Sequence, residues 1–303
     1  MSVLRELAAF VTRASVASLP ETERATQRRH VADTLLAAAV GAWTTEGRHL
    51  RYVLSRNSMA DAIGMQVAVV RHTEIDDIHT PSCTTPSSVT VPTALGLAHA
   101  GGISDPERVA SAIWVGTELM TRLGAALDGP RILYRGVWPT YFAAPLAAAA
   151  VTARMGQMSE DECAHALSLA LMLTAGRAGR FQGKIPGRSV ILAMAVGAGV
   201  RAAEAARRGV GGDPDLLDGP WLRDAHGLQA DLGMLTADLG RGSVYAQLSL
   251  KPFCSAKQAI AATEALMTLI DEGVAPDSIT KVTVRAPPPY ARMIATKPEA
   301  GSR

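Results

Sequence analysis

Apolar residues recur at helical spacing through most of the chain, and polar caps and prolines separate the runs. The segment 21–43 follows the sequence SLPE, which has the form of a capping box with proline in the first turn. The caps SDPE at 104–107 and SEDE at 159–162 precede further apolar stripes. In the first of these segments we expect one face to be buried, formed by Val31, Leu35, Leu36 and Ala39.

Prolines and a glycine mark the ends of other predicted helices. Pro92 and Pro139 stand where a first helical turn is expected to begin, ahead of alanine-rich runs. A further helix is predicted over 188–208, with Gly209 as its C-terminal cap. These boundaries predict a succession of helices over nearly the whole chain.

Small side chains dominate the apolar part of the sequence. Hydrophobic residues make up 48% of the chain but aromatic residues only 4%. Alanine favours helices and lets them approach closely, so the composition also points to an α protein. The runs 144–150 and 193–206 have no strong polar face. We expect such helices to lie in the core or at a dimer interface.

The pattern changes near the C-terminus. The sequence SVYAQLSL at 243–250 partly alternates and is predicted to be extended, and a helix is predicted over 256–271. Residues 277–285 alternate with β-branched side chains and are predicted to form a strand. A single strand cannot satisfy its own backbone. We therefore expect an all-helical domain over residues 1–272, followed over 273–303 by the beginning of a smaller α/β domain that is truncated.

Charge and cysteine content exclude several classes of protein. The net charge of +2 gives no reason to expect a nucleic acid or a membrane surface as a partner. The most apolar stretch, 190–200, is shorter than the ~20 residues of a membrane span. The three cysteines form no CxxC pair, and Arg5 and Glu6 interrupt the apolar core that a secretory signal requires. These features predict a soluble cytoplasmic protein.

A long polar loop at 71–88, between two apolar helices, carries the densest group of ionisable residues. Glu74, Asp76, Asp77 and His79 fall within six positions. Groups so close perturb each other's protonation, which suits acid–base chemistry. The alternative is a solvated loop whose acids cap the next helix.

Two other functions of this loop fit the sequence less well. Hard carboxylates with one thiolate, Cys83, match no metal well, and no HxxxH or HExxH motif accompanies them, so no metal site is expected. An aspartate-rich DDxxD motif, as in terpenoid synthases, would require an acid where Thr80 stands. Acid–base chemistry without a metal is therefore the preferred hypothesis.

Two further segments carry positive charge beside a predicted helix start. In GRAGRFQGKIPGR (176–188), Lys184 and Arg188 suit an anion site, although arginines beside glycines are also common on surfaces. Ile185 excludes a Walker loop. In SLKPFCSAKQ (249–258), burial of Lys251 would lower its pKa and make it a base or a carboxylate partner. Cys254 lies just before a helix, where a thiolate is stabilised, or it is a small buried filler.

Five collinear segments resemble the MmgE/PrpD family, which includes 2-methylcitrate dehydratase, cis-aconitate decarboxylase and iminodisuccinate epimerase. RGVWPT is similar to a segment that typically reads RGFHPT, and KPFC is similar to the KPYPSC-type signature. The five segments are RHVADTLLAAAVG (29–41), EIDDIHTPSCTTPSSVTVPTAL (74–95), RGVWPT (135–140), GKIPGR (183–188) and KPFC (251–254).

The resemblance implies a large, usually dimeric helical domain, a smaller α/β domain, an active site between them, and no metal or organic cofactor. Lys184 and Lys251 occupy the two family lysine positions, which would hold substrate carboxylates. Glu74 and Asp77 fall where the family places an essential aspartate. Further candidates for substrate contact are His79, Thr84, Thr85, Trp138, Arg188 and Cys254.

Two positions depart from the family pattern. Thr85 and Trp138 stand where the citrate-like branches carry histidines linked to acid–base steps. This difference disfavours 2-methylcitrate dehydration and cis-aconitate decarboxylation as the reaction of this chain.

The expected function is that of a cofactor-independent lyase or isomerase. It would remove a proton next to a carboxylate of a small di- or tricarboxylate, with Glu74, Asp77 or a neutral lysine as base and with fixed cations stabilising the carbanion. The alternative is a catalytically degenerate or truncated helical dimer without activity.

Overall fold

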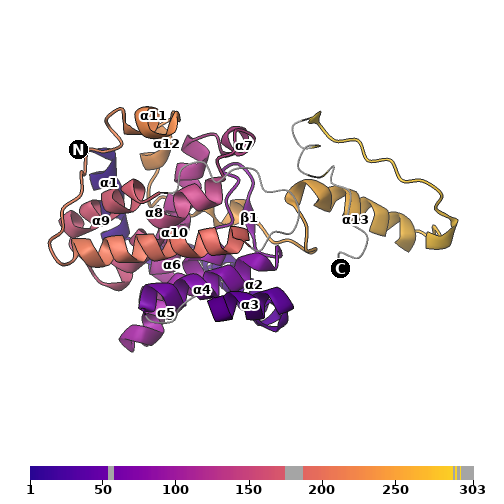
Figure 1. Ribbon diagram of the computed structural model, residues 1–303, viewed down its shortest axis with the longest axis horizontal. Coiled ribbons are helices and arrows are strands. Elements are labelled where there is room, and N and C mark those ends of the chain that lie inside the picture. The colour runs from indigo at the N-terminus through magenta and orange to yellow at the C-terminus, as the bar shows by residue number, and fades with distance from the viewer. Residues whose placement is uncertain (54–57, 175–186, 289–290, 292–293, 295–303) are drawn as a thin grey trace.

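The computed structural model describes residues 1–53, 58–174, 187–288, 291 and 294, and these residues are mainly α-helical (Figure 1). The mainly α fold class is therefore confirmed. The described residues form thirteen α-helices: α1 (Val3–Arg13), α2 (Glu21–Trp43), α3 (Thr45–Val53), α4 (Met59–His72), α5 (Ser87–Gly101), α6 (Pro106–Ala126), α7 (Gly129–Leu133), α8 (Pro139–Met155), α9 (Glu160–Met172), α10 (Gly187–Ala206), α11 (Trp221–His226), α12 (Gly233–Thr236) and α13 (Lys257–Asp271). Short elements complete them: 3-10 turns η1 (Val16–Ser18), η2 (Val244–Gln247) and η3 (Pro276–Ser278), and strands β1 (Ile78–His79) and β2 (Leu248–Ser249).

The core lies where α4, α6, α8, α9 and α10 pack against one another. Almost every residue of α8 is buried, including its run of alanines. Gly199 of α10 lies so close to the backbone of Pro145 in α8 that a Cβ would not fit between them. The small-residue helices predicted to be central are therefore central, because small side chains let their backbones approach.

One of the predicted capping devices has the expected geometry, and others differ. Ser159 and Glu162 form a reciprocal capping box at the start of α9. Asp105, and not Ser104, caps α6 by accepting from two backbone amides. The predicted capping box before α2 is wrong, because Ser18 ends a separate 3-10 turn and Pro20 stands at the cap without a side-chain bond.

The predicted helix starts at proline are confirmed at one position and wrong at another. Pro139 is the first residue of α8. Pro92 lies inside α5, which begins at Ser87. The Asp77 side chain in the preceding loop accepts from the amide of Ser87. Because this bond satisfies the first amide of α5, the helix starts earlier than proline alone indicated.

The apolar stripe of α2 points away from the core, against expectation. Leu35 and Leu36 are 50% and 66% exposed. The positions of α2 that are buried are mainly polar, and include Gln27, His30 and Thr34. Gln27 donates to the backbone of α6, and His30 pairs with the acidic loop, so specific hydrogen bonds orient the helix more strongly than its leucines do.

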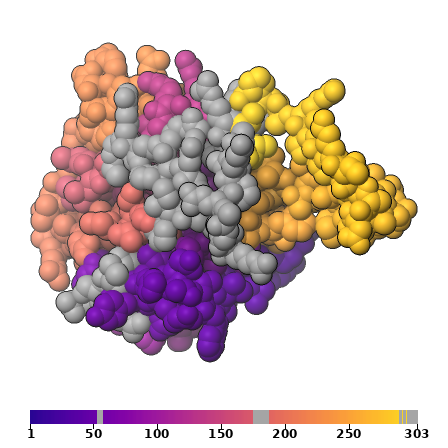
Figure 2. Space-filling model, turned by 45° about the vertical axis from the view of Figure 1, so that its right-hand side comes forward, coloured from indigo at the N-terminus to yellow at the C-terminus, as the bar shows by residue number. Residues whose placement is uncertain are grey.

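The C-terminal part projects from the helical body (Figures 1 and 2). In α13 only Ile260 is buried. The strand predicted over 277–285 is wrong: after η3 the segment runs to residue 287 without a strand partner among the described residues, and Val282 and Val284 are 59% and 54% exposed. Its alternation indicates strand propensity, but a strand requires a neighbouring backbone to bond.

The segment 243–250 also differs from its prediction. The extended segment predicted at 243–250 is a 3-10 turn followed by the two residues of β2, which pair antiparallel with β1.

Among the described residues, α10 alone is long and apolar enough to cross a membrane. Since 61% of its most apolar window is buried inside the protein, its apolarity is that of a core helix.

Candidate active site

The two-stranded sheet joins the acidic loop between α4 and α5 to the segment that precedes Lys251. Ile78 of β1 pairs with Ser249 of β2, two residues before Lys251. This pairing brings a lysine next to acids that lie 175 residues earlier in the chain. The sheet therefore positions the site, although it has only two short strands.

Lys251 and Arg71 form a buried cluster with Asp76. The Lys251 Nζ lies 3.2 Å from Asp76 Oδ1, and the Arg71 Nη1 lies 3.3 Å from the same oxygen. All three side chains are almost inaccessible to solvent. The other carboxylate oxygen of Asp76 is buried without a hydrogen-bond partner. Lys251 and Arg71 thus share Oδ1 of Asp76, while Oδ2 of Asp76 accepts no hydrogen bond.

Glu74 adds a second carboxylate to this cluster. Its Oε2 lies 2.8 Å from Arg71 Nη1, its Oε1 lies 3.3 Å from Arg188 Nη2, and its carbonyl accepts from Lys251 Nζ at 3.2 Å. Burial raises the pKa of Glu74, but the charges of Arg71, Lys251 and Arg188 outweigh burial and lower this pKa to about 2. Its φ of 58° lies in the left-handed region, which is unusual for a non-glycine residue.

The cluster opens into a cavity of about 310 Å³. Trp138 and Arg188 form part of its surroundings: the Arg188 guanidinium lies 5.1 Å from the centre of the Trp138 ring. Trp138 stacks in turn on Tyr141, with ring centres 5.5 Å apart and planes 10° apart. The polar residues lining the cavity include Arg71, Glu74, Tyr141, Arg188 and Cys254.

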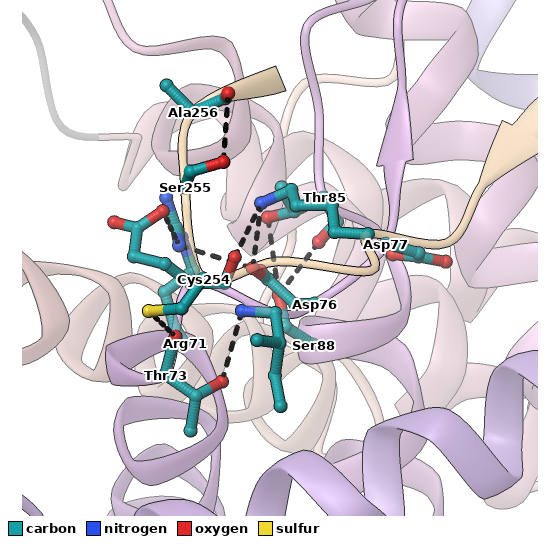
Figure 3. Close-up of polar contacts among 12 residues, drawn as sticks. Arg71, Thr73, Asp76, Asp77, Thr85, Ser88, Cys254, Ser255 and Ala256 are labelled. Atoms are coloured by element: carbon teal, nitrogen blue, oxygen red, sulfur yellow. Dashed lines mark hydrogen bonds and ion pairs between the residues drawn. The ribbon is translucent and has the colours of Figure 1, made fainter. Parts of the chain in front are cut away.

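Cys254 reaches the cavity from the segment that follows Lys251. Its Sγ donates to the carbonyl of Thr73 at 2.8 Å, as Figure 3 shows. This bond ties the Lys251 segment to the end of α4. Cys254 therefore lines the cavity with Arg71 and Glu74.

Asp77 faces away from the cavity. Its Oδ1 accepts from the Ser87 amide at 3.1 Å, and its Oδ2 lies 2.9 Å from His30 Nδ1 and 2.5 Å from Ser87 Oγ. It therefore holds the first turn of α5 and fastens the loop to α2. Both oxygens are occupied inside the protein, unlike those of Asp76.

The threonines of the loop serve its internal packing. Thr84 is buried, and its Oγ1 lies 2.6 Å from Ser82 Oγ. The Thr85 amide donates to Thr140 Oγ1 at 3.1 Å, which joins the loop to the start of α8. Neither threonine is among the residues that line the cavity.

His79 is almost fully buried and does not line this cavity. Its Nδ1 lies 2.8 Å from Ser82 Oγ and its Nε2 lies 3.2 Å from Gln247 Oε1. Burial lowers its pKa below the ordinary value, despite the hydrogen bond to Gln247 and the charge of Asp77. A neutral imidazole with both nitrogens engaged suits a structural link between β1 and η2.

The structure thus brings together Glu74, Lys251, Arg188, Trp138 and Cys254 from the sequence-predicted set. Lys184 lies outside the described residues. In the described part of the chain, no group of three or more His, Cys, Asp or Glu residues is arranged to hold a metal ion.

Sequence reasoning missed three members of the site. Asp76 was one acid among several in the loop, and only its contact with Lys251 distinguishes it from Asp77. Arg71 was noted only as the first residue of the loop. Tyr141 gave no signal, because a single aromatic residue in a helix is most often part of the core.

One known family matches much of this chain. The model of the MmgE/PrpD N-terminal domain matches residues 55–229, which is more than half of the chain and contains α4 to α11. No curated protein matches the sequence significantly. The family match covers the acidic loop, the Trp138 segment and Arg188, and ends before Lys251. The chain belongs to the MmgE/PrpD family.

Proposed function

We propose that this protein is a cofactor-independent lyase or isomerase that removes a proton next to a carboxylate of a small di- or tricarboxylate. The observation that carries the proposal is the pair of arginines, Arg71 and Arg188, that line one cavity with Glu74. Lys251 and Asp76 pair with each other next to this lining, where Lys251 adds a third positive charge. Fixed cations bind an anionic ligand and stabilise the carbanion formed from it.

Each charged residue has a distinct part in this mechanism. Arg71 and Arg188 bind the substrate carboxylate, and Arg71 is well suited because a guanidinium binds carboxylates in a forked geometry. Lys251, held by Asp76, adds positive charge next to Glu74. Lys184, which the family resemblance assigns to the same task, is a further candidate cation.

Glu74 is the proposed base. With Arg71 and Arg188 against it, its pKa of about 2 makes it a weak proton acceptor. A substrate carboxylate competes for the same two arginines. When the substrate carboxylate binds these arginines, its negative charge offsets theirs, so the pKa of Glu74 rises and it becomes a better base. The carbanion then expels a β-substituent or takes a proton back.

We further propose that the protein works as a homodimer in the cytoplasm. The exposed leucines of α2 form part of an apolar face with Val40 and Trp43, which are 54% and 82% exposed. An apolar helix face of this kind is typical of an interface between subunits. The three cysteines are free, as a reducing compartment keeps them.

The experiment that tests the function is proton exchange in heavy water. Small di- and tricarboxylates are incubated with the protein, and loss of the C–H signal next to the carboxylate is followed by NMR. Exchange reports carbanion formation whether the product is that of a lyase or of an isomerase. The proposal predicts exchange with the wild type and its loss in Arg71→Met; exchange retained in Arg71→Met would remove the mechanism.

The alternative is a helical dimer without activity. Its specific support is the lack of imidazole at Thr85 and Trp138, where citrate-like relatives carry histidines. Absence of exchange with every carboxylate, in a folded protein of dimeric mass, would favour this alternative.

A further inference from the structure

Tyr141 lines the cavity with a buried hydroxyl that has no hydrogen-bond partner. It belongs to the first turn of α8, is 1% exposed, and lines the cavity with Arg71 and Glu74. A buried hydroxyl without a partner costs free energy, so its retention requires an explanation.

The surroundings of this hydroxyl select an anionic ligand. The positive charges of Arg71 and Arg188 act on it, together with the negative charges of Glu74 and Asp76. The Nε of Arg71 is likewise buried without a partner. Two unused donors, one neutral and one charged, therefore belong to residues that line the same cavity, and both can donate to a ligand oxygen.

Stacking limits where the hydroxyl can lie. The Tyr141 ring is nearly parallel to Trp138, with ring centres 5.5 Å apart, and the Arg188 guanidinium lies 5.1 Å from the centre of the Trp138 ring. The stacked indole restricts the rotation of the phenol, so its oxygen is preorganised before the ligand arrives. Trp138, which replaces the histidine of the family segment, thus orients the neighbouring tyrosine.

We propose that Tyr141 is a catalytic hydrogen-bond donor of this site: its hydroxyl donates to the carboxylate oxygen of the substrate that gains negative charge when the adjacent proton leaves. The inference rests on the proposed function and deepens it. Tyr141 supplies a neutral donor that the imidazoles of the citrate-like branches would otherwise offer.

The protonation state of the phenol agrees with this role. Burial raises the pKa of Tyr141 above its ordinary value, and the nearby arginines only partly oppose the rise. The phenol therefore stays protonated at neutral pH and acts as a donor, not as the base. Glu74 keeps the task of accepting the proton.

The test compares two tyrosine-to-phenylalanine variants. Tyr141→Phe removes the unpartnered hydroxyl and keeps the stacking ring. Tyr245→Phe is the matched control, because Tyr245 is equally buried but its hydroxyl accepts from Gln27 Nε2 at 2.9 Å and it does not line this cavity. Binding of citrate and of succinate is measured by calorimetry at low salt, together with Tm and heavy-water exchange.

We expect Tyr141→Phe to bind the carboxylate probe about tenfold or more weakly, as for loss of a hydrogen bond to a charged group. Exchange should slow by about 10²–10³, as when one donor to a developing oxyanion is removed. Its ligand-free Tm should stay unchanged or rise, because an unsatisfied buried group is lost. Tyr245→Phe should bind normally and have a lower Tm.

The remaining outcomes overturn the inference in distinguishable ways. If Tyr141→Phe binds and exchanges as the wild type while Arg71→Met does not, the tyrosine has no such role and the proposed function stands. A fall in ligand-free Tm equal to that of Tyr245→Phe would show that the hydroxyl is bonded within the protein, which removes the premise. If the wild type itself neither binds nor exchanges any probe, the proposed function fails and the inference falls with it.

Discussion

Two neighbouring aspartates divide the acidic loop into a cavity side and a core side. Asp76 contacts two cations and has one buried oxygen without a partner, whereas Asp77 has both oxygens occupied by His30 and Ser87. Both aspartates are fully buried, so only their bonding partners distinguish them.

The sign of the surrounding charge differs on the two sides. On the cavity side, three cations surround Glu74 and Asp76. On the core side, Asp77 has a histidine partner and also acts on a second carboxylate, Asp33, whose pKa burial and the charge of Asp77 raise to about 6. Arginines at a cavity can bind an anionic ligand, whereas neighbouring carboxylates without a cation disfavour one. The proposed function therefore involves the cavity side of the loop, and the core side holds the loop in place.

The largest effect is expected from Lys251→Met. The change leaves Asp76 without its lysine partner in a buried place, which costs about 3–5 kcal/mol when one member of a buried pair is removed. Carbanion formation should fall by about 10³ or more, because the proposed mechanism loses one of its fixed cations. Urea unfolding and heavy-water exchange measure the two effects. Lys281→Met, at an exposed position, is the control and should change neither.

The next effect compares the two aspartates directly by amide substitution. Asp76→Asn removes the charge that holds Lys251 and Arg71, so exchange should fall by about 10² while the shape of the loop is kept. Asp77→Asn should leave exchange within a few-fold but cost about 1–2 kcal/mol, because it weakens the bonds to His30 and the start of α5.

The decisive quantity is the rate of exchange in Asp76→Asn relative to that in Asp77→Asn. If Asp77→Asn abolished exchange while retaining its Tm, and Asp76→Asn were active, the functional side of the loop would be the opposite one. Equal loss of exchange in two equally stable variants would mean that the loop acts as a single unit.

Much of the helical body could be predicted from sequence, because caps and prolines act locally. The capping box of Ser159 and the proline start of α8 have the predicted geometry. The outward turn of the leucines in α2 could not be predicted, because helical spacing shows that a face is apolar but not what covers it. Nor could the strand at 277–285 be excluded, since pairing depends on a backbone elsewhere.

The site was predictable in its residue types and not in its contacts. Glu74 and Lys251 were expected from the acidic loop and from the family-like signature. The separation of Asp76 from Asp77 required the long-range contact with Lys251, and local sequence holds no record of it. The orientation of Tyr141 likewise depends on its stacking against Trp138. The sequence shows that tryptophan replaces a histidine of the family-like segment, but it does not show this stacking.

A smaller effect tests the excess of negative charge on the core side. Since the pKa of Asp33 is about 6 in the folded protein and about 3.8 when unfolded, the folded state holds an extra proton between these values, and stability falls as pH rises through this window. Asp33 is partly accessible, so solvent reduces the gain in Asp33→Asn to about 1 kcal/mol at about pH 8, with none at about pH 4. Urea unfolding at both pH values checks this; an equal gain at both would contradict it.

The smallest effect on activity is expected from His79→Gln, since His79 belongs to the core side although it lies in the acidic loop. Glutamine keeps hydrogen-bonding groups near Ser82 and Gln247, so exchange should stay within about threefold of the wild type. The stability profile should nevertheless change. Burial lowers the pKa of His79 in the folded protein, so the unfolded state takes up a proton first as pH falls below about 6.5, and the wild type loses stability there. In His79→Gln this acid-side loss should be smaller, and a large loss of exchange would instead extend the functional side of the loop beyond Asp76.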